Sequence, residues 1–217
     1  MSQSTGNIGR ASLLPAGARA FLRRRLDESV GLALCVGALL FLVALVSFRP
    51  EDPSFNRAAE GVPRNLMGGP GATAAVLAVQ ILGFASLALA VVPFAWGWRL
   101  LRHRGLARWW LRLALLPAAV VATAVALAAV PAAVDGPFAQ SGRGGFVGAE
   151  LLRLLRDRVG AGDDLVGAAG AAIAAVLLYL AAGIPWPAYR AAGRRVGTTA
   201  GSAGRALAFL YRASRRA

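Results

Sequence analysis

The sequence predicts an all-α membrane protein with four transmembrane helices, both termini on the cytoplasmic side, and an amphipathic helix in the second external loop. The first observation is composition: 57% of the 217 residues are apolar and only 16% are charged. A soluble domain is usually about half apolar and about a quarter charged. The second observation is the length of the uncharged stretches, and the third is the uneven placement of arginine along the chain.

Four uncharged stretches of 20, 34, 22 and 25 residues supply the spans, at 29–48, 65–98, 113–134 and 165–189. About 20 helical residues cross a hydrocarbon core, and the stretches do not alternate polar and apolar residues as barrel strands do. The second stretch opens with a Gly- and Pro-rich loop composition. We therefore expect a four-transmembrane domain at 29–189 with helices at about 29–48, 73–98, 113–134 and 165–187.

The first stretch also follows three arginines, Arg23 to Arg25, as a secretory signal peptide would. Its apolar run is too long for such a peptide, and no small-residue cleavage site follows Phe48. These features favour a retained helix.

Arginine placement predicts the orientation. The segments 1–28, 99–112 and 190–217 carry 17 arginines, whereas 49–72 and 135–164 carry seven arginines and eight acidic residues. Positively charged flanks stay in the cytoplasm. We expect a cytoplasmic amino-terminal segment at 1–28 and a basic cytoplasmic tail at 190–217, which is either an amphipathic surface helix or the start of a linker.

The high pI of about 11.8 invites a nucleic-acid interpretation, but every arginine cluster lies where the orientation rule places it. No base-stacking platform accompanies these clusters, so we expect contact with the lipid bilayer, including its anionic lipids, and no direct DNA binding by this segment. Tryptophans near the span ends are expected to lie at the membrane interface as anchors: Trp96, Trp98, Trp109, Trp110 and Trp186.

No catalytic, cofactor or metal site is expected in this chain. The uncharged spans disfavour ion or proton transport, and no phosphate-binding loop, nucleophile elbow or zinc-binding helix motif occurs. The single Cys35 and single His103 are too few for a usual metal site. As it stands, the chain is not expected to be an enzyme.

Two further patterns concern packing. Residues 146–159 place charged residues on one helical face, where ion pairs three or four residues apart can form. The other face carries apolar residues: Val147, Leu151, Leu152, Leu155 and Val159. This segment is too short to span. In the fourth span, small residues suit close helix contact or reflect the Ala and Gly bias of the chain: Gly167, Gly170, Ala171, Ala174 and Ala175.

Several short motifs in the loops occur in a fixed order. The first external loop contains Asp52-Pro53-Ser54-Phe55-Asn56 and Asn65-Leu66-Met67-Gly68-Gly69-Pro70-Gly71-Ala72, the second contains Gly144-Gly145-Phe146-Val147-Gly148, and Ala181-Ala182-Gly183 precedes Trp186. Over roughly residues 20–195 this pattern resembles the amino-terminal four-transmembrane region of the FtsK/SpoIIIE family of bacterial DNA translocases. The candidate interaction or turn residues are Asp52, Pro53, Ser54, Asn56, Asn65, Gly68, Gly71, Gly145 and Gly148.

The resemblance implies a multi-pass anchor in the bacterial inner membrane at the division septum, serving chromosome partition during cell division. It implies division-site proteins as partners and a hexamer formed through a motor, with ATP and Mg bound only by that motor. The motor and its DNA-reading domain are absent from these residues. The alternative is an independent small membrane scaffold or regulator without a motor.

Overall fold

The computed structural model describes residues 16–53, 62–130 and 142–183. The regular secondary structure of these residues is entirely helical. Its helices are α1 (Ala16–Val46), α2 (Gly68–Leu82), the 3₁₀ helix η1 (Gly83–Leu87), α3 (Ala88–Leu101), α4 (Trp109–Ala128), α5 (Gly145–Val159) and α6 (Asp163–Ala182). Four stretches are long and apolar enough to cross a membrane: 17–46, 68–101, 109–128 and 163–182. The predicted all-α fold with four membrane-spanning segments is confirmed, and its orientation stays a prediction.

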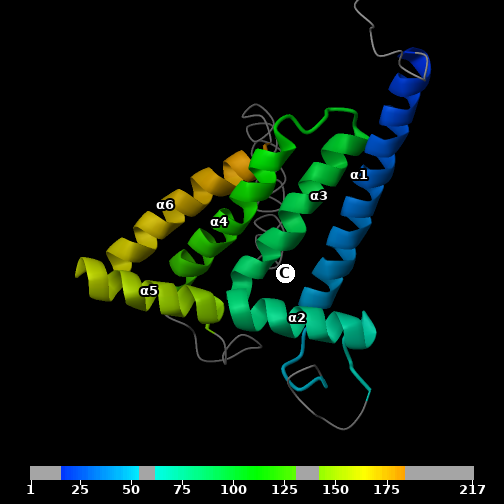
Figure 1. Cartoon of the computed structure of the whole chain (residues 1–217). Coiled ribbons are helices and arrows are strands. Elements are labelled where there is room, and N and C mark those ends of the chain that lie inside the picture. Colours follow the sequence, from blue (N-terminus) through cyan, green and yellow to red (C-terminus); the bar gives the residue numbers. More distant parts are fainter. Residues whose placement is uncertain (1–15, 54–61, 131–141, 184–217) are drawn as a thin grey trace, which may run out of the picture.

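The spanning helices stand side by side in the order α6, α4, α3, α1, while α2 and α5 run across one end of this row (Figure 1). We call that end the loop end. The opposite end, where residues 102–108 connect α3 to α4, is called the arginine end. Packing is strongest within two pairs, α1 with α3 and α4 with α6.

The second span differs from the prediction of one helix at 73–98, which is wrong on two counts. The helix begins earlier, at Gly68, and it breaks at Gly83, where the backbone enters the left-handed region with φ +58°. The chain then passes through η1 into α3, so that α2 lies across the loop end instead of continuing the line of α3 (Figure 1). Gly83 to Leu101 remain as the upright part, about 30 Å long, which suffices to cross the hydrocarbon core.

A close contact between backbones explains the break. A Cβ atom on Gly83 would lie 2.3 Å from the carbonyl oxygen of Arg143, and one on Gly145 would lie 2.5 Å from the backbone nitrogen of Gly83. The backbone N–H of Phe84 donates a 2.9 Å hydrogen bond to the same Arg143 carbonyl. Gly148 extends the contact, because its Cβ would lie 2.3 Å from the carbonyl oxygen of Ala124 in α4. We call Gly83, Gly145 and Gly148 the glycine joint.

The other helix limits differ less. Residues 16–28, predicted as a separate cytoplasmic segment, continue α1 without a break. At 31 residues, α1 is about 46 Å long and exceeds the roughly 30 Å hydrocarbon core. α6 ends at Ala182 and is capped by Gly183, whose φ of +58° is left-handed, and residues 184–187 of the predicted span lie outside the described part. Likewise α4 begins at 109 and ends at 128, before the predicted 134.

Small residues bring each helix pair together. A Cβ on Gly97 of α3 would lie 2.5 Å from the Gly31 carbonyl oxygen of α1, and one on Gly167 of α6 would lie 2.4 Å from Cβ of Ala129. Of the small residues expected to pack, Gly167, Gly170 and Ala174 are buried, whereas Ala171 and Ala175 are exposed. Close backbone approach is how helices associate in lipid, where apolar burial gives no driving force between them.

A matched pair of glycines tests the joint. Gly83 and Gly105 have nearly the same φ, +58° and +60°, but a Cβ on Gly105 meets nothing within 4 Å. We expect Gly105→Ala to cost about 1 kcal/mol of stability from left-handed strain alone. Gly83→Ala should cost about 1–3 kcal/mol more, because the methyl group overlaps the Arg143 backbone. Unfolding of both variants in detergent micelles measures the difference, and equal losses would contradict the role of the joint.

Candidate interaction and anchoring sites

Asp52 of the first loop motif is buried in a turn at the loop end. Its side chain is only 4% exposed, and its carboxylate accepts hydrogen bonds from the backbone N–H groups of Arg64 at 3.1 Å and Asn65 at 2.8 Å. The two bonds join the chain leaving α1 to the chain entering α2. Asp52 therefore uses its hydrogen-bonding capacity within its own loop.

Asn65 completes the same turn and is also 4% exposed. Its Nδ2 donates to the carbonyl oxygen of Ala44 at 2.8 Å, and its Oδ1 accepts from the backbone N–H of Met67 at 3.0 Å. The Ala44 carbonyl lies in the last turn of α1, where helical carbonyls have no partner within the helix. Asn65 thus caps α1 and orients the start of α2. We call this arrangement the Asp52–Asn65 turn.

The glycines of the motif fit around this turn. Gly68 adopts φ +64° and donates its N–H to the Asn65 carbonyl at 2.8 Å. A Cβ on Gly71 would lie 2.7 Å from Asn65 Oδ1, so only glycine permits the contact. Pro53 is half-buried, and Ser54 and Asn56 lie outside the described residues. Gly145 and Gly148, from the second loop, belong instead to the glycine joint.

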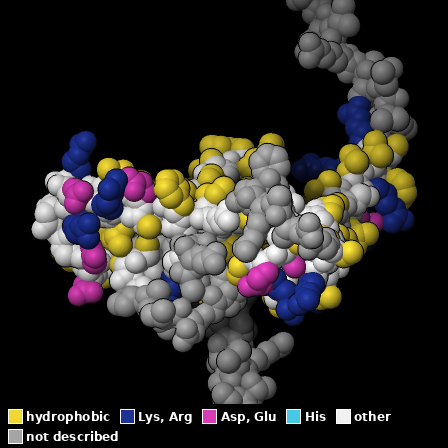
Figure 2. All heavy atoms as spheres, turned by 90° about the horizontal axis from the view of Figure 1, so that it is seen from below, with side chains coloured by type: hydrophobic (Ala, Val, Ile, Leu, Met, Phe, Trp, Pro, Cys, Tyr) yellow, Lys and Arg dark blue, Asp and Glu magenta, His cyan; other side chains and the backbone are white. Residues whose placement is uncertain are grey.

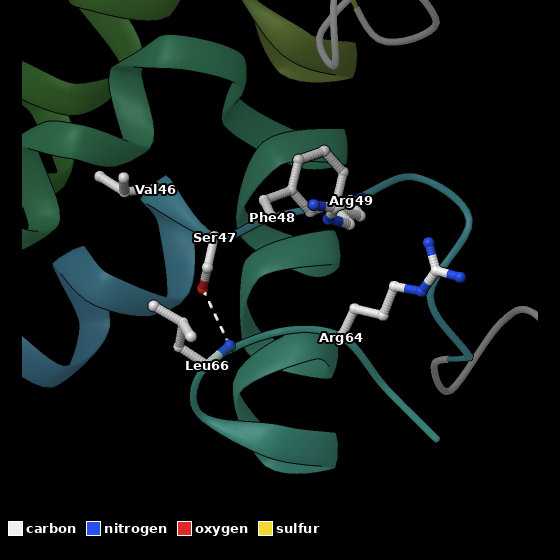
Figure 3. A pocket seen from close by; sticks show the side chains of 6 residues that line it. All are labelled: Val46, Ser47, Phe48, Arg49, Arg64 and Leu66. Atoms are coloured by element: carbon white, nitrogen blue, oxygen red, sulfur yellow. Dashed lines mark hydrogen bonds between the residues drawn. The ribbon is translucent and has the colours of Figure 1, made fainter. Parts of the chain in front are cut away.

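An open pocket of about 460 Å³ lies beside the turn, lined by Val46, Ser47, Phe48, Arg49, Arg64 and Leu66 (Figure 3). The hydroxyl oxygen of Ser47 accepts a hydrogen bond from the Leu66 N–H at 3.2 Å, which fixes the back of the pocket. A second pocket of about 320 Å³ shares Arg49 and Arg64. The sequence carries no local signal for this pair, because the two arginines are 15 positions apart and only the turn brings them together.

The pocket rim combines apolar and basic groups. Leu66 is 78% exposed and Val62 is 87% exposed. Within the described residues, neither Arg49 nor Arg64 forms an ion pair. Exposed apolar side chains next to guanidinium groups that form no ion pair in the described part of the chain suit a partner that offers carboxylates beside an apolar patch.

The other edge of the loop end is formed by α5, whose predicted amphipathic character is confirmed. Leu152 is buried and Val147 and Leu151 are half-buried, but Leu155 and Val159 of the predicted apolar face are exposed. Acidic and basic side chains gather on the outer surface (Figure 2). Arg153 donates a 2.7 Å hydrogen bond to Glu150, and this contact raises the pKa of the Arg153 guanidinium. Arg156 lies 3.6 Å from Asp163 at the start of α6. These exposed pairs keep α5 charged on its outer side.

The expected tryptophan anchors divide into two groups. Trp96 is buried, and its indole Nε1 donates a 2.7 Å hydrogen bond to the Ala181 carbonyl of α6, so its assignment as an interface anchor is wrong. Trp98, Trp109 and Trp110 are exposed near the arginine end, and the Arg102 guanidinium lies 4.7 Å from the ring centroid of Trp98. Trp186 lies outside the described residues.

Two arginines surround the end of α6. Arg99 of α3 donates to the Gly183 carbonyl and, at 3.4 Å, to that of Gly105. The guanidinium of Arg112, in the first turn of α4, lies directly against Gly183. At the same end, Glu28 of α1 pairs with Arg24, Arg25 and His103.

Within the described residues, no three His, Cys, Asp or Glu side chains come together as a metal site would require. The buried Cys35 donates a long, 3.8 Å contact to the Phe94 carbonyl of α3. The chemistry of this part of the chain therefore consists of hydrogen-bonded turns, exposed charges and a basic pocket.

Comparison with known proteins identifies the family of this chain. Residues 23–192 match the family model described as the 4TM region of DNA translocase FtsK/SpoIIIE. The chain is 33% identical to DNA translocase FtsK of Azospirillum brasilense over 84% of its own length and 31% of the relative's. It is 36% identical to DNA translocase FtsK of Bradyrhizobium diazoefficiens over 64% of its length and 17% of the relative's. No solved structure matches.

The chain spans about a third or less of the length of these relatives, and the matched family region is the membrane region and not the motor. Four membrane-capable segments and the family match agree in making it a multi-pass membrane protein. The chain belongs to the FtsK/SpoIIIE family of DNA translocases and represents its amino-terminal four-transmembrane domain.

Proposed function

We propose that this domain is the non-catalytic membrane anchor of a cell-division DNA translocase and that it holds the translocase at the division septum of the bacterial inner membrane. The ATP-driven motor, with its ATP and Mg, would lie in another part of the protein and would form the hexamer. The main support for this proposal is the family match, which covers the membrane region of these translocases and not the motor.

The domain would bind division-site proteins through the pocket next to the Asp52–Asn65 turn. Support comes from the exposed Leu66 of the first pocket and the exposed Val62 of the second, both beside Arg49 and Arg64. This surface fits an acidic and partly apolar segment of a neighbouring membrane protein. The turn itself would position this surface without contacting the partner, because Asp52 and Asn65 are buried and bonded within the loop.

The alternative is an independent small membrane scaffold that works without a motor. Such a scaffold would have the same membrane domain and the same loop-end surface. It would differ from the anchor only in having no motor. An antibody against the loop at 135–164 distinguishes the two in membranes of the native organism. A band far above 22.4 kDa indicates the anchor of a larger translocase, and a band at 22.4 kDa indicates the scaffold.

A fluorescent fusion of residues 1–217 tests the septal role. We expect it to collect at mid-cell in dividing cells that keep their own translocase, because the membrane domain carries the septal contacts in this proposal. Uniform membrane fluorescence in constricting cells, with the fusion intact by immunoblot, would contradict it.

Charge reversal tests the pocket. The double variant Arg49→Glu and Arg64→Glu should weaken recovery of division proteins by co-purification by about tenfold, because close charge pairs at interfaces couple by more than 1 kcal/mol. The matched control reverses Arg153 and Arg156 on α5, which lie at the other edge of the loop end. Equal losses from both double variants would assign the effect to net charge and not to the pocket.

A third experiment separates the turn from the surface. Asp52→Ala leaves the N–H groups of Arg64 and Asn65 without their acceptor, so we expect a loss of about 1–3 kcal/mol in stability. Glu51→Ala, at the exposed neighbouring position, should change stability by less than about 0.5 kcal/mol. If Asp52→Ala kept full stability but lost partner recovery, Asp52 would be a contact residue.

A further inference from the structure

At the arginine end, two guanidinium groups lie together without a carboxylate. Arg99 and Arg112 are both half-buried. Both point to the end of α6, where Arg99 donates to the Gly183 carbonyl and Arg112 lies against the Gly183 backbone. Helix carbonyls carry partial negative charge, which compensates only part of two full positive charges.

Their donors are also incompletely used. In the described part of the chain, Arg99 Nε and Arg112 Nη1 are buried without a hydrogen-bond partner. The Arg112 guanidinium forms no ion pair within the described residues. A guanidinium group with five donors and no acceptor at a half-buried position is a costly arrangement unless an anion binds there.

The chain itself offers no suitable anion at this end. Residues 1–26 and 99–112 contain no Asp or Glu, and neither do residues 184–217. Asp27 and Glu28 are the acids on this side, and Glu28 is already shared by Arg24, Arg25 and His103. Asp27 forms no ion pair with either arginine in the described part of the chain. An anion for these two arginines would therefore come from outside these residues.

The position along the bilayer identifies its source. Arg112 lies in the first turn of α4, at the level where a span enters the headgroup region. Trp109, three residues earlier on the same helical face, is 63% exposed, as an indole in a headgroup layer would be. Lipid phosphate is the anion present at high concentration at this depth.

We propose that Arg112, supported by Arg99, forms a binding site for the phosphate of an anionic glycerophospholipid at the junction of α3, α4 and the end of α6. Two parallel N–H donors of the Arg112 guanidinium hold two phosphate oxygens, and the lipid headgroup stays beside the Trp109 indole. The site does not depend on the septal role, since it concerns only the chain and its bilayer.

Native mass spectrometry of the purified 217-residue chain, released from detergent micelles with titrated lipid, tests the site. We expect phosphatidylglycerol to bind about tenfold more tightly than phosphatidylcholine, because choline neutralises the headgroup charge that two arginines recognise. Arg112→Gln should lower phosphatidylglycerol affinity by about tenfold and leave phosphatidylcholine binding nearly unchanged. Arg104→Gln, an equal charge change at an exposed position of the same end, should leave both within about twofold.

Three outcomes would overturn the proposal: equal affinity of the wild-type chain for the two lipids, an equal loss from Arg104→Gln, or complete competition by inorganic phosphate at millimolar concentration. The second outcome would indicate diffuse surface charge, and the third a soluble anion. If Arg112→Gln cannot be purified in folded form, Arg112→Lys keeps the charge and removes the forked donors. It should weaken phosphatidylglycerol binding by about threefold, and unchanged binding in this variant would overturn the assignment.

Discussion

The contact of the Gly83 and Gly145 backbones is the constraint on which the rest of this domain depends. Without it, residues 68–101, which contain α2 and α3, could continue as one helix of 34 residues, about 50 Å long, which is far longer than a hydrocarbon core. The break at Gly83 turns α2 across the loop end and leaves an upright segment of suitable length. It also brings the start of α5 against α4 through Gly148, so that one contact places three helices.

The two helix pairs are joined by different means at their two ends. At the loop end, α2, η1 and α5 bridge the pairs through backbone contacts. Toward the arginine end, Trp96 of α3 packs with Leu116 and Val120 of α4 and donates its N–H to the Ala181 carbonyl of α6. A directed hydrogen bond from a large buried ring is worth more here than further apolar contact, because lipid competes equally well for apolar side chains.

The number of spans and the helical class could be predicted, because a long uncharged stretch is sufficient evidence for a span. The break at Gly83 could not be predicted. A lone glycine within an apolar stretch is common in membrane helices, and only Arg143 and Gly145, some 60 positions away, make its left-handed conformation necessary. Trp96 was misassigned for a related reason: its position near a span end suits an interface anchor, but Ala181 supplies a buried acceptor. The pocket at Arg49 and Arg64 likewise depends on the Asp52–Asn65 turn, which joins distant segments. Local patterns predicted the elements, and long-range backbone contacts decided how they meet.

The end of α6 shows how such contacts would serve an anchor. In the proposed role, a motor attached after α6 would pull on this helix first. Trp96 holds the Ala181 carbonyl and Arg99 holds the Gly183 carbonyl, so a load on the last turn of α6 passes directly to α3 and, through the Gly31 and Gly97 contact, to α1. α4 shares the load through its long contact with α6. The spans would then resist extraction together, because pulling α6 away from α3 would leave the Ala181 and Gly183 carbonyls without their donors.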